Sequence, residues 1–183
     1  MKGNANLKPE TNNYYSFSVD YINPKSLLNA TLITSYNHIY NKIDIIGTND
    51  LKEYNYLNIN VFKAFNAEVL LKWRIINNLQ FKSGYVFTKV FEDDNTIKLS
   101  TVSPHAYTAQ LEYTFSKGFY EVTANISGKI TGSKDYYEPE NQNYYLVKLP
   151  TYSLWNFNIY QQFGKYVFVN TGVKNILNYR LIS

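Results

Sequence analysis

The chain has 183 residues, a net charge of +4 and no cysteine, and aromatic residues make up 17% of it. No apolar run approaches the ~18 residues of a membrane-spanning helix, so a helical membrane protein is excluded. Aromatic and β-branched residues are spread along the whole chain, which argues against disorder. The lysines are scattered and only Arg74 and Arg180 are arginines, so we expect no nucleic-acid partner. The composition fits an all-β protein with one polar face and one apolar face.

Apolar and polar residues alternate in runs along the chain, with the period of two that is typical of a strand with unlike faces. The first run covers Tyr14 to Tyr21, and the second begins at Leu28. From Leu57 to Ile75 one parity holds throughout, apart from Lys63, and predicts a strand far longer than the roughly five or six residues common in soluble sheets. Later runs begin at Leu79, Tyr107, Tyr120 and Trp155, and a last run covers Tyr166 to Asn175. We therefore expect about eight antiparallel strands.

The connections between these runs alternate between short and long. Short turns are expected at residues 23–25, 76–78, 116–118 and 164–165, and long links at residues 41–53, 92–104 and 132–150. Short turns at one end and long loops at the other are typical of an antiparallel transmembrane β-barrel in the bacterial outer membrane. A secreted β-sandwich also alternates, but the strand length and the two-ended loop pattern favour the barrel. The aromatic residues that suit its interfacial girdles are Tyr21, Tyr36, Tyr54, Trp73, Tyr113, Tyr152, Trp155 and Tyr166.

Four segments, in order along the chain, add a resemblance to this pattern. Residues 3–10 read GNANLKPE, Asn66-Ala67-Glu68 stands in the longest run, Ser103-Pro104-His105 opens a later strand, and residues 167–180 read VFVNTGVKNILNYR. Together they resemble the barrel of a TonB-dependent outer-membrane receptor, in which the last segment is the penultimate strand and the following turn. The resemblance implies that residues 1–183 are a C-terminal part of a barrel of about 22 strands. It also implies that the plug domain, the TonB-engaging motif and the final strand are missing from this chain.

The function implied by the resemblance is active uptake of a scarce, large nutrient, such as siderophore-bound iron, cobalamin, haem or a glycan. The partners would be outer-membrane lipid, the solute and, through the missing N-terminal part, the plug domain and the TonB complex. The alternative is a small outer-membrane barrel without energised transport, in which eight strands close on themselves to form an adhesin, a structural protein or a passive pore. The sequence begins without an apolar export segment, so we expect a piece of a longer precursor or a truncated reading frame.

The turn at residues 76–78 brings basic residues together on the inner face of the expected barrel. Pairing Ile75 with Leu79 sets Lys72 opposite Lys82, and like charges directly opposed destabilise a sheet. In a wide barrel, water or an acidic plug surface would relieve this repulsion, whereas a narrow barrel would need a carboxylate nearby. The residues that we expect to face a plug are Lys72, Arg74 and Lys82.

The longest link, residues 132–150, carries the best candidates for ligand contact. These are Tyr136, Tyr137, Tyr144 and Tyr145, which stand among several acidic residues. Rigid aromatic surfaces with a few polar groups suit a sugar, a siderophore or a cobalamin-like solute. The alternative is that these tyrosines only pack the rim of the barrel. The two histidines lie far apart, and no catalytic motif, phosphate-binding loop or metal-ligand spacing is present, so we expect no enzyme, cofactor or metal site.

Overall fold

The computed structural model describes residues 4–47, 54–92, 102–140 and 143–180. Within these ranges the chain forms ten strands, and no helix there is long and apolar enough to cross a membrane. The strands are β1 (Thr11–Asn23), β2 (Leu28–Gly47), β3 (Tyr54–Ile76), β4 (Leu79–Glu92), β5 (His105–Lys117), β6 (Tyr120–Thr131), β7 (Lys134–Glu140), β8 (Asn143–Leu149), β9 (Tyr152–Phe163) and β10 (Val167–Val173). The expected all-β fold class is confirmed.

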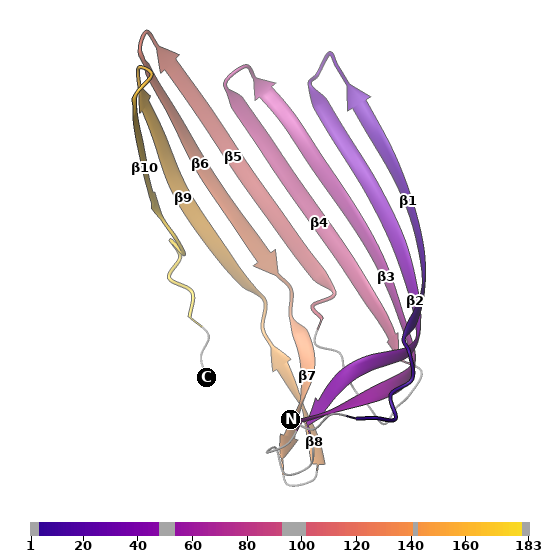
Figure 1. The fold of residues 1–183 in the computed structure, drawn as a ribbon. Coiled ribbons are helices and arrows are strands. Elements are labelled where there is room, and N and C mark those ends of the chain that lie inside the picture. The colour runs from indigo at the N-terminus through magenta and orange to yellow at the C-terminus, as the bar shows by residue number, and fades with distance from the viewer. Residues whose placement is uncertain (1–3, 48–53, 93–101, 141–142, 181–183) are drawn as a thin grey trace.

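Eight of the strands form one antiparallel sheet in the order β1-β2-β3-β4-β5-β6-β9-β10, and β7 and β8 form a separate hairpin. Neighbours in the sheet are also neighbours in sequence, except that β6 pairs with β9 across the β7–β8 hairpin. Strands β1 and β10 are the two edges and lie on opposite sides of the sheet (Figure 1). The expected eight strands are therefore confirmed. The alternative of a small closed barrel is wrong, because closure would require β1 to pair with β10.

The sheet has a turn end and a loop end. The tight turns that join β1 to β2, β3 to β4, β5 to β6 and β9 to β10 all lie at the upper end in Figure 1, which we call the turn end. The long connections lie at the opposite end, the loop end. Gly118 and Gly164 stand in two of the tight turns with a φ of 62°, a left-handed conformation that glycine adopts at little cost. The expected alternation of short and long connections is confirmed.

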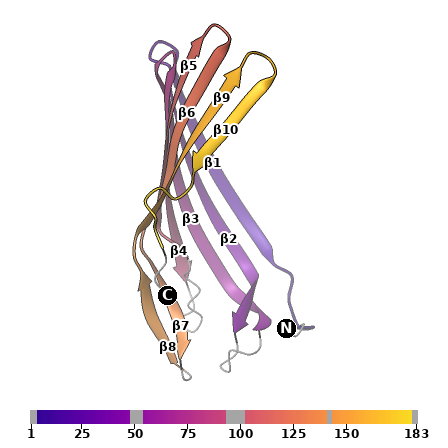
Figure 2. The same cartoon turned by 90° about the vertical axis from the view of Figure 1, so that its left-hand side faces the viewer.

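The register gives the sheet two unlike faces, because directly paired residues of antiparallel strands lie on the same face. On the apolar face, Trp73 pairs with Leu28 and Phe81. On the polar face, one residue further along, Lys72 pairs with Lys82. A hollow follows the polar face from β2 across to β9. Figure 2 shows the curved sheet turned by 90°, with the β7–β8 hairpin continuing beyond it at the loop end.

The sheet is one layer thick and has almost no core of its own. Among the described residues, Ile59 and Ala64 are the only buried hydrophobic side chains, whereas Tyr15, Phe17 and Tyr21 are 65%, 62% and 54% exposed. Burying one large apolar side chain contributes about 1.5–3 kcal/mol, so a face left this open requires an apolar solvent. The arrangement suits lipid on the apolar face and water or a polar domain on the other.

One detail of the expected register is wrong. Ile76, rather than Ile75, pairs with Leu79, because the register shifts by one residue next to the turn. The shift is confined to the end of the hairpin, where a bulge adds one residue to β3. Lys72 still pairs with Lys82, so the expected juxtaposition of two lysines is confirmed.

Three further expectations need correction. β2 continues to Gly47, inside the expected link at residues 41–53, and the expected link at residues 132–150 contains the β7–β8 hairpin. Apolar and polar residues do not alternate strictly in these segments, because both faces of a hairpin outside the membrane contact water. Tyr152, expected in an aromatic girdle, lies on the polar face, where its ring stacks on Tyr179 at a centroid distance of 5.1 Å.

Strands β2 and β3 extend beyond β1 and bend away from the sheet at the loop end (Figure 1). Asn41, at the bend, has a left-handed φ of 51°. Asn58 Oδ1 accepts a hydrogen bond from Lys8 N at 2.7 Å, and Asn58 Nδ2 donates to Lys8 O at 3.0 Å and to Asn41 O at 2.7 Å. Glu10 Oε2 accepts a further hydrogen bond from Ile43 N at 2.9 Å. The GNANLKPE segment therefore anchors the bent end of the β2–β3 hairpin.

The other terminal segment of the resemblance, residues 167–180, forms β10 and a compact turn. Asn175 has a φ of 52°, and its side-chain amide binds both backbone groups of Tyr179, at 2.9 Å to O and 3.0 Å from N. The backbone N of Ile176 donates to Trp155 O at 2.8 Å. Asn58 thus fixes the N-terminal segment through the backbone of Lys8, and Asn175 fixes the C-terminal segment through the backbone of Tyr179.

Candidate functional site

The polar face carries the three basic residues that the sequence singles out. Lys72 on β3 pairs directly with Lys82 on β4, and Arg74 lies two residues nearer the turn end on the same face. Lys72 and Arg74 are exposed. All three line the hollows of this face. The structure therefore brings Lys72, Arg74 and Lys82 together as one basic group.

The carboxylates of the polar face do not neutralise this group. Glu68 lies on β3 nearer the loop end, and Glu112 lies on β5 in the same row as Arg74, with Gln80 of β4 between them. Glu112 Oε2 instead accepts a hydrogen bond from Gln110 Nε2 at 3.5 Å. Within the described ranges, the side chains of the basic group form no hydrogen bond or ion pair. Their positive charge is left facing the hollow.

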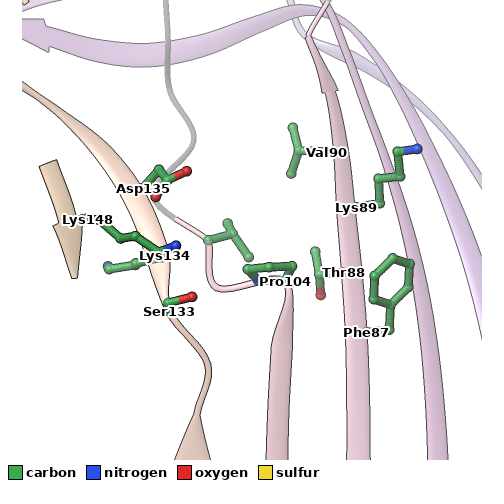
Figure 3. Close-up of a pocket in the computed structure, with 10 residues that line it drawn as sticks. Phe87, Thr88, Lys89, Val90, Pro104, Ser133, Lys134, Asp135 and Lys148 are labelled. Carbon is green, nitrogen blue, oxygen red and sulfur yellow. The ribbon is translucent and has the colours of Figure 1, made fainter. Parts of the chain in front are cut away.

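A pocket lies at the loop end, between the end of β4 and the start of the β7–β8 hairpin (Figure 3). Lys134, Asp135 and Lys148 line it on the hairpin side, and Thr88 and Val90 line it from β4. Asp135 pairs directly with Lys148 in the hairpin register. The remaining lining residues are Phe87, Lys89, Val102, Pro104 and Ser133. The Lys89 side chain lies on the opposite side of β4, toward the apolar face, so the charged side chains at the pocket are Lys134, Lys148 and Asp135 (Figure 3). Two lysines and one aspartate give the pocket a basic lining, which suits an anionic or polar group.

The four tyrosines of the expected ligand site lie on this same hairpin. Tyr136 and Tyr137 belong to β7, and Tyr144 and Tyr145 belong to β8, where they pair with Pro139 and Glu138. Their side chains lie outside the part of the chain that the structure describes. The backbone places all four tyrosines beyond the pocket of Figure 3, on the hairpin whose base lines it.

Sequence reasoning did not assign Lys134 or Lys148 to a site. Lys134 is one polar residue in a polar segment, and Lys148 is a single lysine among Leu146, Val147 and Leu149, so no motif or periodicity marks either residue. Recognition of residues 134–149 as a hairpin would have placed Lys148 opposite Asp135. No group of three or more His, Asp or Glu side chains that could hold a metal ion occurs among the residues with described positions.

The geometry just described, an antiparallel sheet with open edges, tight turns at one end and a polar hollow, corresponds to a known family. A family model described as TonB dependent receptor-like, beta-barrel, matches residues 1–176. The chain belongs to this family. As a TonB-dependent receptor barrel it lies in the bacterial outer membrane, as the sequence predicts.

Solved structures share the fold of this TonB-dependent receptor barrel. The FrpB iron transporter from Neisseria meningitidis (F3-3 variant) is 15% identical, with a TM-score of 0.73 over 95% of this chain and 28% of that one. The ferric enterobactin receptor PfeA (G324V mutant) from Pseudomonas aeruginosa is 17% identical, with a TM-score of 0.75 over 96% and 27%. The ferric yersiniabactin uptake receptor FyuA from Yersinia pestis is 14% identical, with a TM-score of 0.68 over 93% and 25%.

The chain thus spans about a quarter of the length of each of these structures. No match was found among curated protein sequences. The similar structures are transporters and receptors by their descriptions, and at this level of identity they establish the fold.

Proposed function

We propose that this chain is part of the barrel of a TonB-dependent receptor that actively takes up a scarce, large nutrient. The observation that carries the proposal is the open eight-stranded sheet with a polar, hollowed face. Further strands added at β1 and β10 would make a barrel wide enough for a plug and a large solute. Siderophore-bound iron, cobalamin, haem and a glycan are the solute classes to test. FrpB and PfeA, which are described as an iron transporter and a ferric enterobactin receptor, make iron the first choice.

The energy for uptake would reach the barrel through an N-terminal plug domain and the TonB complex. The test is uptake by cells in which the full-length receptor gene is intact, deleted, or intact with TonB inactivated. We expect accumulation of one labelled solute of the panel to require both the receptor and TonB. Accumulation that is unchanged without TonB would instead identify a passive pore.

The basic group of Lys72, Arg74 and Lys82 would face the plug. Lys72 and Arg74 are exposed on the hollowed face and Lys82 is half-buried there. The three side chains have no carboxylate partner among the described residues. An acidic plug surface would relieve the repulsion between Lys72 and Lys82, since like charges directly opposed destabilise a sheet. The plug domain is therefore the partner proposed for these residues.

This part of the proposal is tested in the full-length receptor with Lys72→Gln and Lys82→Gln combined. Cysteine crosslinking between plug and barrel measures how well the plug is seated. We expect weaker crosslinking in the double variant and wild-type crosslinking in Lys117→Gln, which removes a charge from the apolar face of β5. Equal crosslinking in all three proteins would refute the assignment.

The β7–β8 hairpin would capture the solute before it enters the barrel. Tyr136, Tyr137, Tyr144 and Tyr145 stand on this hairpin, above a pocket with a basic lining. Aromatic surfaces bury a large contact area with little loss of side-chain entropy, and the lysines would hold an anionic group. Replacing the four tyrosines by alanine is expected to weaken solute binding and uptake by the full-length receptor. Unchanged uptake would show that they only pack the rim.

A further inference from the structure

The hollow of the polar face contains a third lysine, which does not belong to the basic group. Lys129 on β6 pairs with Thr108 of β5, which in turn pairs with Gly84 of β4, and all three residues line the hollow. Lys72 and Lys82 line the same hollow from β3 and β4. The described residues that line it include these three lysines and no aspartate or glutamate. The hollow therefore has a positive lining that extends from β3 to β6.

The lysines occupy two separate positions in the hollow. Lys72 and Lys82 are direct partners on neighbouring strands. From Lys82 the register leads through Gln110 of β5 to Ser127 of β6, and Lys129 lies two residues nearer the loop end. Strands of a regular sheet lie about 4.8 Å apart and rise about 3.3 Å per residue, so the Cα atoms of Lys82 and Lys129 lie about 12 Å apart. Two anionic groups on one solute match this separation.

Uncharged hydrogen-bond donors also line the hollow. Ser127 pairs with Asn156 of β9, and both residues belong to the lining. Asn156 Oδ1 accepts a hydrogen bond from Asn175 N at 3.0 Å, which leaves Asn156 Nδ2 to donate. Within the described ranges, the Ser127 hydroxyl and the three lysines of the hollow form no hydrogen bond or ion pair. Ammonium, hydroxyl and amide N–H groups all donate to carboxylate and phosphate oxygens, so this lining suits an anion.

Three carboxylates lie near the hollow, but they do not line it. Glu68 pairs with Val86 of β4, one step of two residues nearer the loop end than the lining of that strand. Glu112 accepts the hydrogen bond from Gln110, and Asp20 Oδ1 accepts one from Thr31 Oγ1 at 2.6 Å at the β2 side of the hollow. None of the three forms an ion pair with a lysine of the hollow in the part of the chain that the structure describes. An anion in the hollow therefore meets donors and positive charge on every strand from β3 to β6.

Two leucines give the hollow an apolar part. Leu70 on β3 and Leu154 on β9 lie in the same row as Gly84 and are 40% and 38% exposed. A Cβ atom added to Gly84 would lie 2.8 Å from Thr108 Oγ1 and 3.2 Å from Leu70 Cδ2, so these two side chains close over the glycine and form a floor. Apolar walls with a few placed polar groups are typical of sites for organic ligands. The floor therefore suits the organic part of a solute rather than a small inorganic ion.

We propose that the hollow is a transit site for an organic solute that carries two or more anionic groups, such as carboxylates, phosphates or catecholates. The lysines at the two positions hold the anionic groups, and the leucines contact the organic part of the solute. The inference rests on the proposed function, because the solute reaches the hollow only after the plug has moved away from Lys72 and Lys82. It narrows the solute to an anionic complex and excludes a neutral glycan.

The test is uptake by cells that carry the full-length receptor, with TonB active or inactivated. The anionic probes are ferric citrate, a ferric tris-catecholate and haem, and the neutral probes are a ferric trihydroxamate, cyanocobalamin and maltohexaose. We expect uptake of an anionic probe that requires both the receptor and TonB. Lys129→Gln is expected to slow this uptake about tenfold, the lower end of what one hydrogen bond to a charged group contributes. Binding of the probe to energy-depleted cells is expected to stay unchanged, because capture takes place at the loop end.

Two further variants separate charge from packing. Lys129→Arg keeps the positive charge and is expected to retain most of the uptake. The matched control is Lys165→Gln, which removes an exposed lysine from the turn between β9 and β10 and is expected to behave as wild type. Heat-dependent gel migration checks that each variant is folded. If Lys129→Gln does not fold, Ser127→Asp, which places a carboxylate between the two lysine positions, is expected to slow uptake of the anionic probe by a similar factor.

Four results would overturn the inference. Receptor- and TonB-dependent uptake of neutral probes alone would leave the proposed function intact and refute the anionic site. Wild-type uptake by Lys129→Gln, an equal loss in Lys165→Gln, or an equal loss in Lys129→Arg would each refute the role of the charge. If uptake of none of the probes requires both the receptor and TonB, the proposed function fails, and this inference fails with it.

Discussion

The contact between Gly128 and Trp155 allows a sharp test of packing on the apolar face. The two residues pair directly across β6 and β9. A Cβ atom added to Gly128 would lie 2.3, 2.4 and 2.7 Å from three atoms of the indole ring. Carbon atoms in contact normally lie about 3.5–4.0 Å apart, so the ring would have to shift by more than about 1 Å. We expect Gly128→Ala to destabilise the barrel by about 1–3 kcal/mol, the usual cost of overpacking.

A double-mutant cycle isolates this effect. With Trp155→Ala in place, Gly128→Ala removes no contact and restricts the unfolded chain, so it is expected to be neutral or to stabilise by about 0.4–1 kcal/mol. The assay is urea unfolding of the four full-length proteins in lipid vesicles, followed by circular dichroism. The expected result is that Gly128→Ala destabilises the protein when Trp155 is present and does not destabilise it in the Trp155→Ala background. Additive effects, or a neutral Gly128→Ala in the presence of Trp155, would refute the packing argument.

Two further predictions concern the asparagine amides. Asn58→Ala removes the side-chain hydrogen bonds to Lys8, each of which contributes about 0.5–1.5 kcal/mol. We expect this variant to speed hydrogen exchange of the Lys8 amide. Asn60→Ala, on the same strand, is the control. Unchanged exchange in Asn58→Ala would contradict the anchoring role. Asn175→Ala loses the bonds to Tyr179 and also places alanine at a φ of 52°, so we expect a cost about 1–2 kcal/mol larger than that of Asn175→Gly. Proteolysis rates of the C-terminal turn measure the difference, and equal rates in the two variants would show that the left-handed position carries no cost.

Much of the sheet could be predicted from the sequence, because each strand has lipid on one face and water or a polar domain on the other. Apolar and polar residues therefore alternate along every such strand. The pairing of Lys72 with Lys82 followed from parity and a tight turn, even though a bulge shifts the residues next to the turn. The β7–β8 hairpin was not predicted, because a segment with water on both sides needs no alternation. The bonds between Asn58 and Lys8 join polar residues 50 positions apart, and no local pattern indicates such a contact. An even longer separation in sequence concealed the approach of Lys148 to the end of β4.

The place where the chain leaves the sheet between β6 and β9 has a consequence for what the barrel displays. Thr131 and Tyr152 pair directly, so the excursion starts and ends on adjacent strands, roughly 5 Å apart. The entropic cost of closing a loop rises only slowly with its length, by about 0.6 kcal/mol for each doubling. The hairpin can therefore be exchanged, lengthened or replaced by an inserted epitope while every pair of the eight-stranded sheet keeps its register. Changes in the length or sequence of this hairpin therefore meet few constraints from the folding of the sheet.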